Sequence, residues 1–543
     1  MPPKKFQSTS KRKATTAPDP PNKRSRPDVD TSESPSSPQQ DEDGIVQRKF
    51  YPPEMTNERC HQYNNNEIPR PIEVLESAMS ETAQEREGVT VKDSVVHWFK
   101  CDLRIQDNTA LHMAAEKAKE KDVPLICLYL VSPQDFEAHL TSPARVDFIL
   151  RSLEVLKEDL GMLDIPLYVE VVEKRKTIPD RLVALCEQWS AAHVYANIEY
   201  EVDELRREAL LVRKCLEKGI AFSAVADTCV VAPGKLHTQA GKQFAVYSLW
   251  FRAWLSFLHS NPIRLDLHKP PDKNSTSTRT THKHLFESRI PPAPENKKLS
   301  AEEQKRFRSL WPAGEHEAHA RLKRFLHEKV RGYKDMRDFP GANSTAVVSV
   351  HLASGTLSAR TAVSMNKPFK PAYTNITWNH SPHHLHAWKT GQTGSPIVDA
   401  SMRQLLHTGY MHNRCRMIVA SFLTKDLLLD WRLGEKFFMQ HLIDGDFASN
   451  NGGWGFCASV GVDPQPYFRV FNPVLQGERF DAEGEFIRRW VPELRRVEGK
   501  AVHDPYGRGK GSVVEREGYP RLVVEHKFGR ERALERYKEG LAR

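Results

Sequence analysis

Short apolar runs alternate with helical patterns along residues 90–235 of this 543-residue chain. Amphipathic patterns at 145–160 and 178–188 predict helices that cross between buried strands. The predicted strands are SVVHWF (94–99), PLICLYLV (124–131), PLYVEVV (166–172) and AHVYANI (192–198). This alternation predicts an α/β domain built on a doubly wound parallel sheet. No Gly-x-Gly-x-x-Gly follows the first strand, so a conventional dinucleotide site is not expected there.

The pattern becomes helical after Leu310 and stays so to the end of the chain, so residues 310–543 are expected to form an all-helical domain. Residues 236–309 are expected to link the two domains over the surface, because their central part, 262–300, is rich in Pro, Ser and Thr. Residues 1–88 lack aliphatic periodicity and are rich in Pro, Ser, Lys and Asp, which predicts a disordered tail.

Two basic clusters, KRK at 11–13 and KRSR at 23–26, lie in this tail on either side of a Pro-containing spacer. The arrangement is typical of a two-part nuclear import signal; a solvated basic tail and an acid-poor mitochondrial presequence are the alternatives. The net charge of +9 is modest for this length. No apolar run approaches the roughly 20 residues of a spanning helix, so no membrane partner is expected. The eight cysteines show no zinc-ligand spacing and no disulfide framework, which favours a reducing compartment.

A helix predicted at 410–428 carries an unusual set of side chains on one face. That face holds, at i, i+3, i+4 and i+7, Asn413, Arg416, Met417 and Ala420. One interpretation is a core helix in which Arg416 pairs with an acid such as Asp444.

The run MQHLIDGDFASNNGGWG at 439–455 favours a binding site instead. We expect a Gly-rich loop here, since its glycines let the backbone approach a ligand closely. Its polar side chains are Asp444, Asp446, Asn450 and Asn451. Polar groups that converge from a helix face and a loop predict a pocket for a flat ligand with polar edges.

Five motifs within 394–473 resemble the flavin-binding helical domain of the cryptochrome and photolyase family, in particular class I cyclobutane pyrimidine dimer photolyases of fungi. They are GSPIVDASMRQL, MHNRCRM, DWRLGEKFF, IDGDFASNNGGWGF and DPQPYFRVFNP. The resemblance implies a deoxyribodipyrimidine photo-lyase that uses bound FAD and light to split dimers in DNA. The residues that it assigns to FAD are Tyr333, Thr345, Ala346, Val347, Val348, Ser349, Arg416, Asp444, Gly445, Asp446 and Asn450. A neutral amide at Asn450 favours a reduced flavin and thus repair over signalling.

The resemblance also assigns residues to electron transfer and to DNA. Trp454, Trp431 and Trp378 match a chain of indoles that leads electrons to the flavin, although three core tryptophans are the plain alternative. Asn413 and Met417 match residues that touch a dimer flipped out of the duplex. Residues that match phosphate contacts, and that could equally be solvated surface side chains, are Arg337, Arg414, Arg469 and Gln476. We expect a monomer whose partner is damaged DNA.

An antenna chromophore is implied for the α/β domain. His139, Asp203 and Glu204 match the positions that contact a pterin in relatives with a folate antenna. Methenyltetrahydrofolate is therefore expected, with deazaflavin as the alternative. On residue types alone, a surface histidine and a solvated acidic pair are equally ordinary.

The chain departs from the family pattern at Val363 and Ser364, where about forty residues of that pattern are absent, enough for two or three helices. In the family this segment supplies a dimer-binding glutamate, a stacking tryptophan and part of the flavin pocket. A skipped or mispredicted exon is the favoured explanation. The rival functions are a cryptochrome-type blue-light receptor and an inactive DNA-binding relic.

Overall fold

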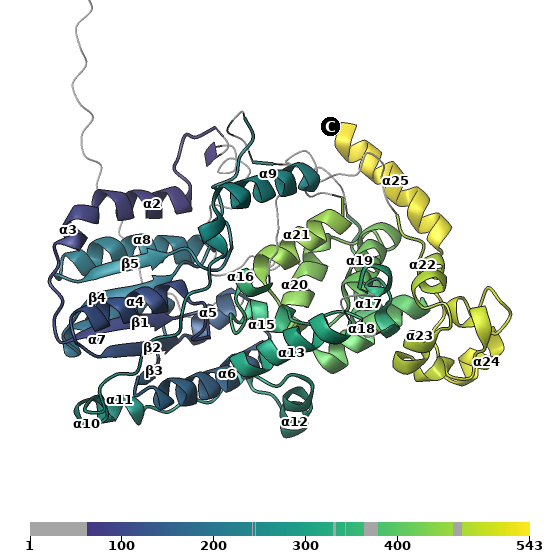
Figure 1. Ribbon diagram of the computed structural model, residues 1–543. Helices are drawn as coiled ribbons and strands as arrows, with labels where there is room; N and C mark the ends of the chain where they lie inside the picture. The colour runs from purple at the N-terminus through teal and green to yellow at the C-terminus, as the bar shows by residue number, and fades with distance from the viewer. Residues whose placement is uncertain are drawn as a thin grey trace, which may run out of the picture. The chain divides into compact units, whose positions relative to one another are not determined.

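Five parallel strands form one sheet in the computed structural model, which describes residues 62–63, 65–239, 241, 243–244, 246–329, 333–342, 344–362, 378–459 and 470–542. The strands are β1 (Ser94–Phe99), β2 (Leu125–Val131), β3 (Leu167–Val171), β4 (Ala191–Asn197) and β5 (Ala221–Val225). Their spatial order is β3-β2-β1-β4-β5, so the direction of winding reverses beside β1 (Figure 1). This is the order of a doubly wound sheet, and the predicted α/β fold is confirmed.

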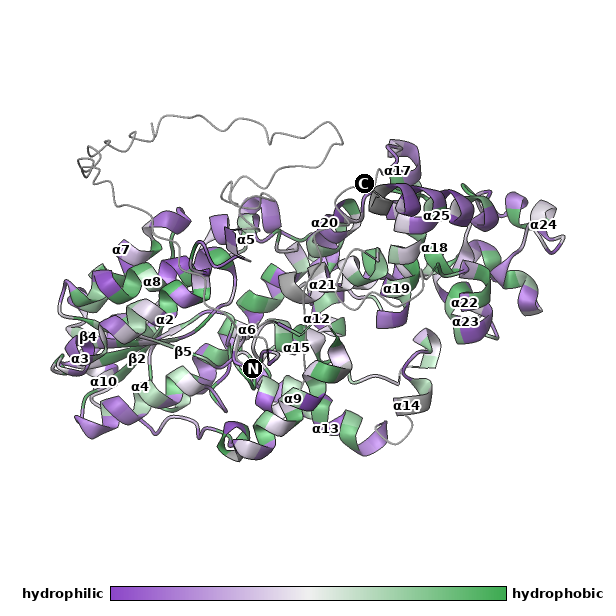
Figure 2. Cartoon of the chain, turned by 90° about the horizontal axis from the view of Figure 1, so that it is seen from above, coloured by the Kyte–Doolittle hydropathy of each residue, from purple (hydrophilic) through white to green (hydrophobic). Residues whose placement is uncertain are grey.

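Helices cover both faces of the sheet. α2 (Pro71–Glu81), α7 (Ile178–Gln188) and α8 (Val202–Leu216) pack on one face, and α4 (Thr109–Glu120) and α6 (Pro143–Met162) pack on the other. Every residue of β1, β2 and β4 is buried. Burial on both faces explains why these strands have continuous apolar sequences, which colour them mostly green in Figure 2.

Two parts of this domain were not predicted. The prediction of a disordered tail up to residue 88 is wrong for residues 71–87. Here α2 and α3 (Ala83–Glu87) form, and Leu75 lies fully buried against the sheet. Charged residues dilute the apolar face of α2, which hid it from the hydrophobic pattern. β5 was missed because AFSAV is short and, apart from Phe222, made of small residues. Both basic clusters of the tail lie outside the described residues.

The second half of the chain is helical, as predicted. Its core joins α18 (Pro396–Thr408), α19 (Asn413–Ser421), α20 (Trp431–His441) and α21 (Phe447–Cys457) around Trp388, Leu405, Ile418 and Trp454. α17 (Pro382–Thr390), α22 (Pro473–Phe480), α23 (Glu485–Trp490) and α25 (His526–Ala542) complete the bundle in Figure 1. None of the described helices combines the length and the hydropathy needed to span a bilayer.

Two local predictions in this half need correction. The helix expected at 410–428 begins at Asn413, where the His412 side chain caps it, and continues after Ser421 as a π-helical turn, η7 (Phe422–Asp426). The expected loop at 439–455 is mostly helix, since α21 starts at Phe447. Asp446 caps α21 by accepting a hydrogen bond from the Ser449 N–H at 2.7 Å. The cap and the buried Trp454 outweigh the low helix propensity of its glycines.

The segment expected to be a surface linker, 236–309, contains two substantial helices, α9 (Tyr247–Ser260) and α12 (Ala301–Leu310). Trp254 and Leu258 of α9 are buried beside Val230. Phe307 of α12 is buried with Trp311 and Ile443. The segment thus packs against both halves of the chain.

Candidate functional site

A cavity of about 510 Å³ lies in the helical half, within the size range of ligand sites. α19 contributes its whole predicted face to it. The other predicted residues that line it are Asp444, Gly445, Asp446, Asn450 and Trp454. The predicted face of α19 and the Gly-rich segment therefore meet at one site, and the predicted pocket is confirmed.

Arg416 and Asp444 form an ion pair at the cavity. The Arg416 Nη2 donates to both carboxylate oxygens, at 3.0 and 2.8 Å, and its Nε donates to the Met411 carbonyl at 2.7 Å. The Asp444 side chain is only 1% exposed. Because these bonds use Nε and Nη2, the remaining nitrogen, Nη1, is the one that can meet a ligand. The pair places opposite charges at the cavity wall with little net charge.

The α/β half holds the turn that carries Asp444. From the start of α6, Ser142 donates its hydroxyl to the Leu442 carbonyl at 2.9 Å, and Arg145 donates to the Gly445 carbonyl. Arg145 also donates to the Ala353 carbonyl at 2.9 Å. These bonds fix the backbone on either side of Asp444, so the acid is positioned before a ligand arrives.

Asn450 faces the cavity from the end of the first turn of α21. Its Nδ2 donates to the Glu435 carbonyl at 2.9 Å and lies 3.4 Å from the Glu435 carboxylate. With the amide nitrogen engaged on α20, the amide oxygen remains for a ligand. The side chain therefore presents an uncharged hydrogen-bond acceptor to the cavity.

The three predicted tryptophans form a series that leads away from the cavity. Trp454 lines it, 2% exposed, with ring centroids 5.0 Å from Phe438 and 5.9 Å from Trp388. Trp431 packs both on this core and on a second cluster that contains Leu428 and Tyr537. Trp378 packs on the second cluster only, 5.8 Å from the Tyr537 ring in an edge-on contact.

The predicted phosphate loop does not line the cavity. Tyr333 packs edge-on against Phe325 at 5.4 Å, and the Thr345 side chain lies close to the Tyr410 hydroxyl. Burial raises the pKa of Tyr410 to about 12. Because Arg416 lies over the Tyr410 ring at 5.5 Å, the loop reaches the site through Tyr410.

Val347, in the middle of this loop, has a φ of 51°. A β-branched residue in the left-handed region is strained by about 1 to 3 kcal/mol. Such strain is typical of loops under functional constraint. Ala346, Val348 and Ser349 flank Val347, and Ser349 begins α15 (Ser349–Ala353).

The candidate DNA contacts gather near the start of α19. Arg414 pairs with Asp338 at 2.8 Å and lies 4.4 Å over the Phe480 ring of α22. Arg337, next to Asp338, is exposed, and Gln476 lies on α22. Arg337, Arg414 and Gln476 thus come from three segments that meet there, while Arg469 lies outside the described residues.

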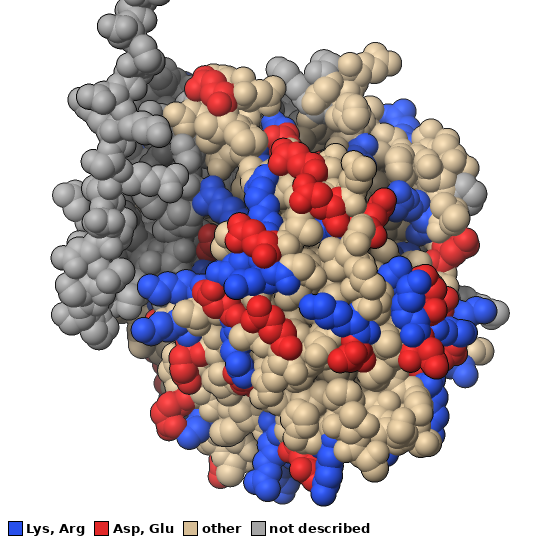
Figure 3. Space-filling view, turned by 90° about the vertical axis from the view of Figure 1, so that its left-hand side faces the viewer, with Lys and Arg blue, Asp and Glu red and all other residues tan. Residues whose placement is uncertain are grey.

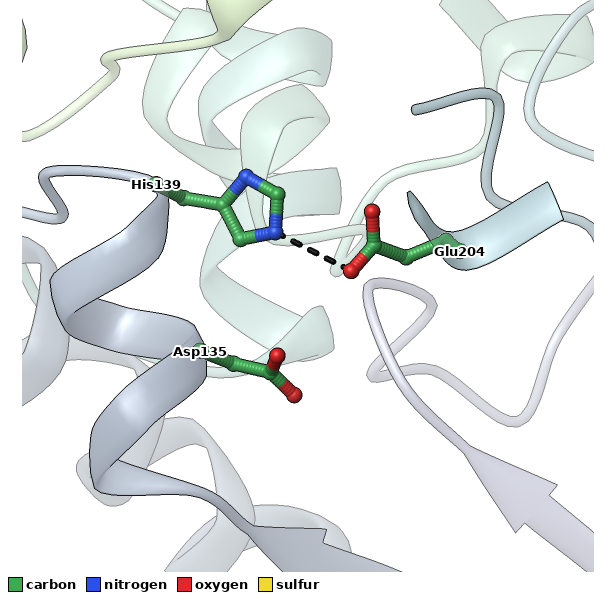
Figure 4. A group of neighbouring side chains, drawn as sticks. All are labelled: Asp135, His139 and Glu204. Carbon is green, nitrogen blue, oxygen red and sulfur yellow. Dashed lines mark hydrogen bonds and ion pairs between the residues drawn. The ribbon is translucent and has the colours of Figure 1, made fainter. Parts of the chain in front are cut away.

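The three predicted antenna residues meet in one ion-pair network, part of which Figure 4 shows. His139 Nε2 lies 3.1 Å from Glu204 Oε1. Arg175 bonds Asp135 at 2.7 Å, Asp203 at 2.9 Å and Glu204 at 2.8 Å. Burial opposes protonation of His139, but the bond to Glu204 raises its pKa above the ordinary value.

Asp135, His139 and Glu204 are also residue types that bind divalent metals, and their ligand atoms lie within 4.8 Å of one another. However, Arg175 and Arg207 already donate to the Asp135 carboxylate, and Arg175 donates to Glu204. Two guanidinium groups supply the positive charge that a metal would bring. The cluster is therefore an ion-pair network built on arginine.

The sequence reasoning missed several residues of the cavity wall, among them Tyr247 and Trp250 of α9. These two residues lie in the segment that was expected to be a linker. The density of aromatic residues in YSLWFRAWLSF was the available signal.

On the face of the α/β half shown in Figure 3, basic and acidic side chains are interspersed, so that face carries no continuous basic patch for a DNA backbone.

Comparisons with known proteins identify relatives of both halves. Residues 95–271 match the family model described as DNA photolyase, and residues 351–539 match the model described as the FAD binding domain of DNA photolyase. A deoxyribodipyrimidine photo-lyase of Neurospora crassa is 53% identical, covering 98% of this chain and 96% of that protein. A mitochondrial deoxyribodipyrimidine photo-lyase of Saccharomyces cerevisiae is 32% identical over 91% of this chain and 95% of that protein.

Among solved structures, a class III photolyase of Agrobacterium tumefaciens superimposes with a TM-score of 0.70 and 30% identity, covering 83% of this chain and 98% of that one. The alignment with the Neurospora protein has 588 positions, 45 more than the 543 residues of this chain. At least 45 positions are therefore gaps in this chain.

Proposed function

Since the chain belongs to the DNA photolyase family, we propose that it repairs cyclobutane pyrimidine dimers in damaged DNA under near-ultraviolet or blue light, with FAD in the cavity between α19 and α21. The observation that carries this proposal is the lining of that cavity, where Asn413 and Met417 lie beside the Arg416–Asp444 pair and Asn450. When bound, reduced FAD supplies the electron that splits the dimer. A blue-light receptor is less supported, because both curated relatives described above are named photo-lyases.

The polar wall of the cavity suits a flavin ring. The Arg416–Asp444 pair offers a donor and an acceptor at the ring's polar edge, and Asp446 and Gly445 continue that edge. The Asn450 oxygen can accept a hydrogen bond from a protonated ring nitrogen and adds no negative charge. Tyr333 and the loop from Thr345 to Ser349 are assigned to the phosphates.

Trp454, Trp431 and Trp378 are proposed to carry electrons to the flavin when it is oxidised. Their order of packing supports this, since Trp454 is at the cavity and Trp431 touches both the Trp454 core and the cluster that holds Trp378. An electron from solvent would therefore enter at Trp378.

A dimer flipped out of the duplex is proposed to enter the cavity and meet Asn413 and Met417. Arg337, Arg414 and Gln476 would contact phosphates at its mouth, together with Arg469. The exposed Arg337 and the clustering of these segments around Arg414 support that role. Contacts of this kind are independent of base sequence and weaken with salt, as recognition of a lesion requires. We propose that the protein works as a monomer.

The network of His139, Asp203 and Glu204 is proposed to hold an antenna chromophore. Methenyltetrahydrofolate is the first candidate, and deazaflavin is the alternative. The basic clusters of the tail support a nuclear location. A mitochondrial one is the second candidate, because the Saccharomyces relative is named mitochondrial.

Repair of a dimer-containing oligonucleotide by the purified full chain tests the function, with flavin content measured on the same sample. Light-dependent repair that is lost in Asn413→Ala and kept in the surface variant Leu249→Ala supports it. Flavin binding without repair would favour a receptor or an inactive relic. A sample that binds no flavin would show that the segment missing at 363/364 is required for the site.

A further inference from the structure

Helix α9 carries a row of aromatic rings in contact with one another. Successive contacts join Tyr247 to Trp250, at a centroid distance of 6.0 Å and an angle of 31°, and Trp250 to Trp254, at 6.1 Å and 30°. Phe251 lies between Tyr247 and Trp254, at angles of 21° and 16° to them. The four rings thus pack on one another at angles between 16° and 31° and form one aromatic cluster on α9.

The row is anchored at its C-terminal end and reaches the cavity at its N-terminal end. Trp254 and Leu258 are 7% and 5% exposed, and they pack with Val230 at the end of the α/β half. Trp250 and Tyr247, one and two turns before Trp254, line the cavity, and Tyr247 is 43% exposed. α21, the helix that carries Asn450 and Trp454, lines the same cavity.

The position of α9 relates it to the shortened part of the chain. Ala359 of α16 (Ala359–Ala362) packs against the same cluster as Trp250 and Trp254. α16 directly precedes Val363, where about forty residues of the family pattern are absent. α9 therefore packs beside α16, the last described helix before Val363.

We propose that Tyr247 and Trp250 form an aromatic wall of the flavin site in this chain and stack against the flavin ring, in place of the wall that the missing segment would supply. The proposal rests on the proposed FAD site and adds two binding residues to it. The other groups of the cavity, from Arg416 to Asn450, act on the polar edge of the ring. Flat aromatic side chains stack favourably on the apolar face of such a ring, and Tyr247 and Trp250 provide them.

FAD titration of the flavin-stripped full chain tests this, with Kd measured by flavin fluorescence. We expect Trp250→Leu to weaken FAD binding about tenfold, the effect of removing one stacked aromatic pair. Trp250→Phe keeps a flat ring and is expected to stay within about threefold of wild type. Leu249→Ala is the matched control, because Leu249 lies on the same helix, is 48% exposed and does not line the cavity.

Tyr247→Ala keeps the test decisive if Trp250→Leu does not fold, since a side chain that is 43% exposed contributes little to the core. We expect it to weaken FAD binding several-fold at an unchanged midpoint of thermal unfolding. Wild-type affinity in a folded Trp250→Leu or Tyr247→Ala protein would overturn the aromatic wall and leave the FAD site intact. Failure of the wild-type chain to bind FAD would overturn both the site and the wall.

Discussion

A methyl group at Gly434 has no room beside Trp454, and we expect Gly434→Ala to destabilise the helical half. A Cβ at this position of α20 would lie 2.1 Å from Trp454 Cη2 and 2.7 Å from Leu423 Cδ2. Neither neighbour can move away easily, since Trp454 is 2% exposed and Leu423 is fully buried. Overpacking of a tight core costs up to about 3 kcal/mol.

The same substitution raises helix propensity, which offsets part of that cost. Glycine in a helix interior is about 1 kcal/mol less favourable than alanine. Gly434→Ala should therefore lower the free energy of unfolding by about 2 kcal/mol. Gly453→Ala is the matched control: it lies inside α21, and a Cβ there meets no atom within 4 Å. It should raise the free energy of unfolding by about 1 kcal/mol.

Urea unfolding of both flavin-free variants, followed by tryptophan fluorescence, measures the two values. The expected difference between the variants is about 3 kcal/mol, and it isolates the contact with Trp454 from helix propensity. Equal stabilities within about 0.5 kcal/mol would refute the tight packing of Trp454 on α20. They would also remove the reason why a glycine is needed at that position.

Three further predictions concern charge, pH and electron transfer. Asp444→Ala leaves Arg416 without its partner, so FAD binding should weaken at least tenfold in a titration. Asp446→Asn keeps an oxygen for the α21 cap and should have a smaller effect on FAD binding. Burial raises the pKa of Glu315 to about 7, so the folded state binds its proton more tightly and the free energy of unfolding should fall by roughly 2 to 3 kcal/mol between pH 5 and pH 8. Glu315→Gln should abolish this fall in the free energy of unfolding, measured by urea unfolding at the two pH values. An unchanged pH dependence in the variant would contradict the raised pKa of Glu315. Trp378→Phe should slow photoreduction of bound FAD, measured by absorbance under blue light with external reductant, at unchanged FAD affinity; an unaltered rate would place electron entry elsewhere.

Long elements with a clear period were predictable from the sequence because their burial is uniform. β1 and α7 have the bounds that their patterns indicated, since strands buried on both faces must be apolar throughout and α7 carries a regular apolar face. α2 and α9 were missed for opposite reasons. The apolar face of α2 is narrow and diluted by charge, and α9 is an aromatic helix of 14 residues that directly precedes a stretch rich in Pro, Ser and Thr.

The chemistry of the site was determined by the sequence, whereas its arrangement was decided by tertiary structure. The side chains at 413, 416, 417 and 420 share a helix face by spacing alone, and the acids and amides near Asp444 predicted a polar pocket. Local sequence could not show that Asp446 would start a helix through a glycine-rich run, because packing of Trp454 against Gly434 stabilises it from outside. Nor could it bring α9 to the cavity, because contacts between residues about 200 positions apart depend on how the whole chain packs.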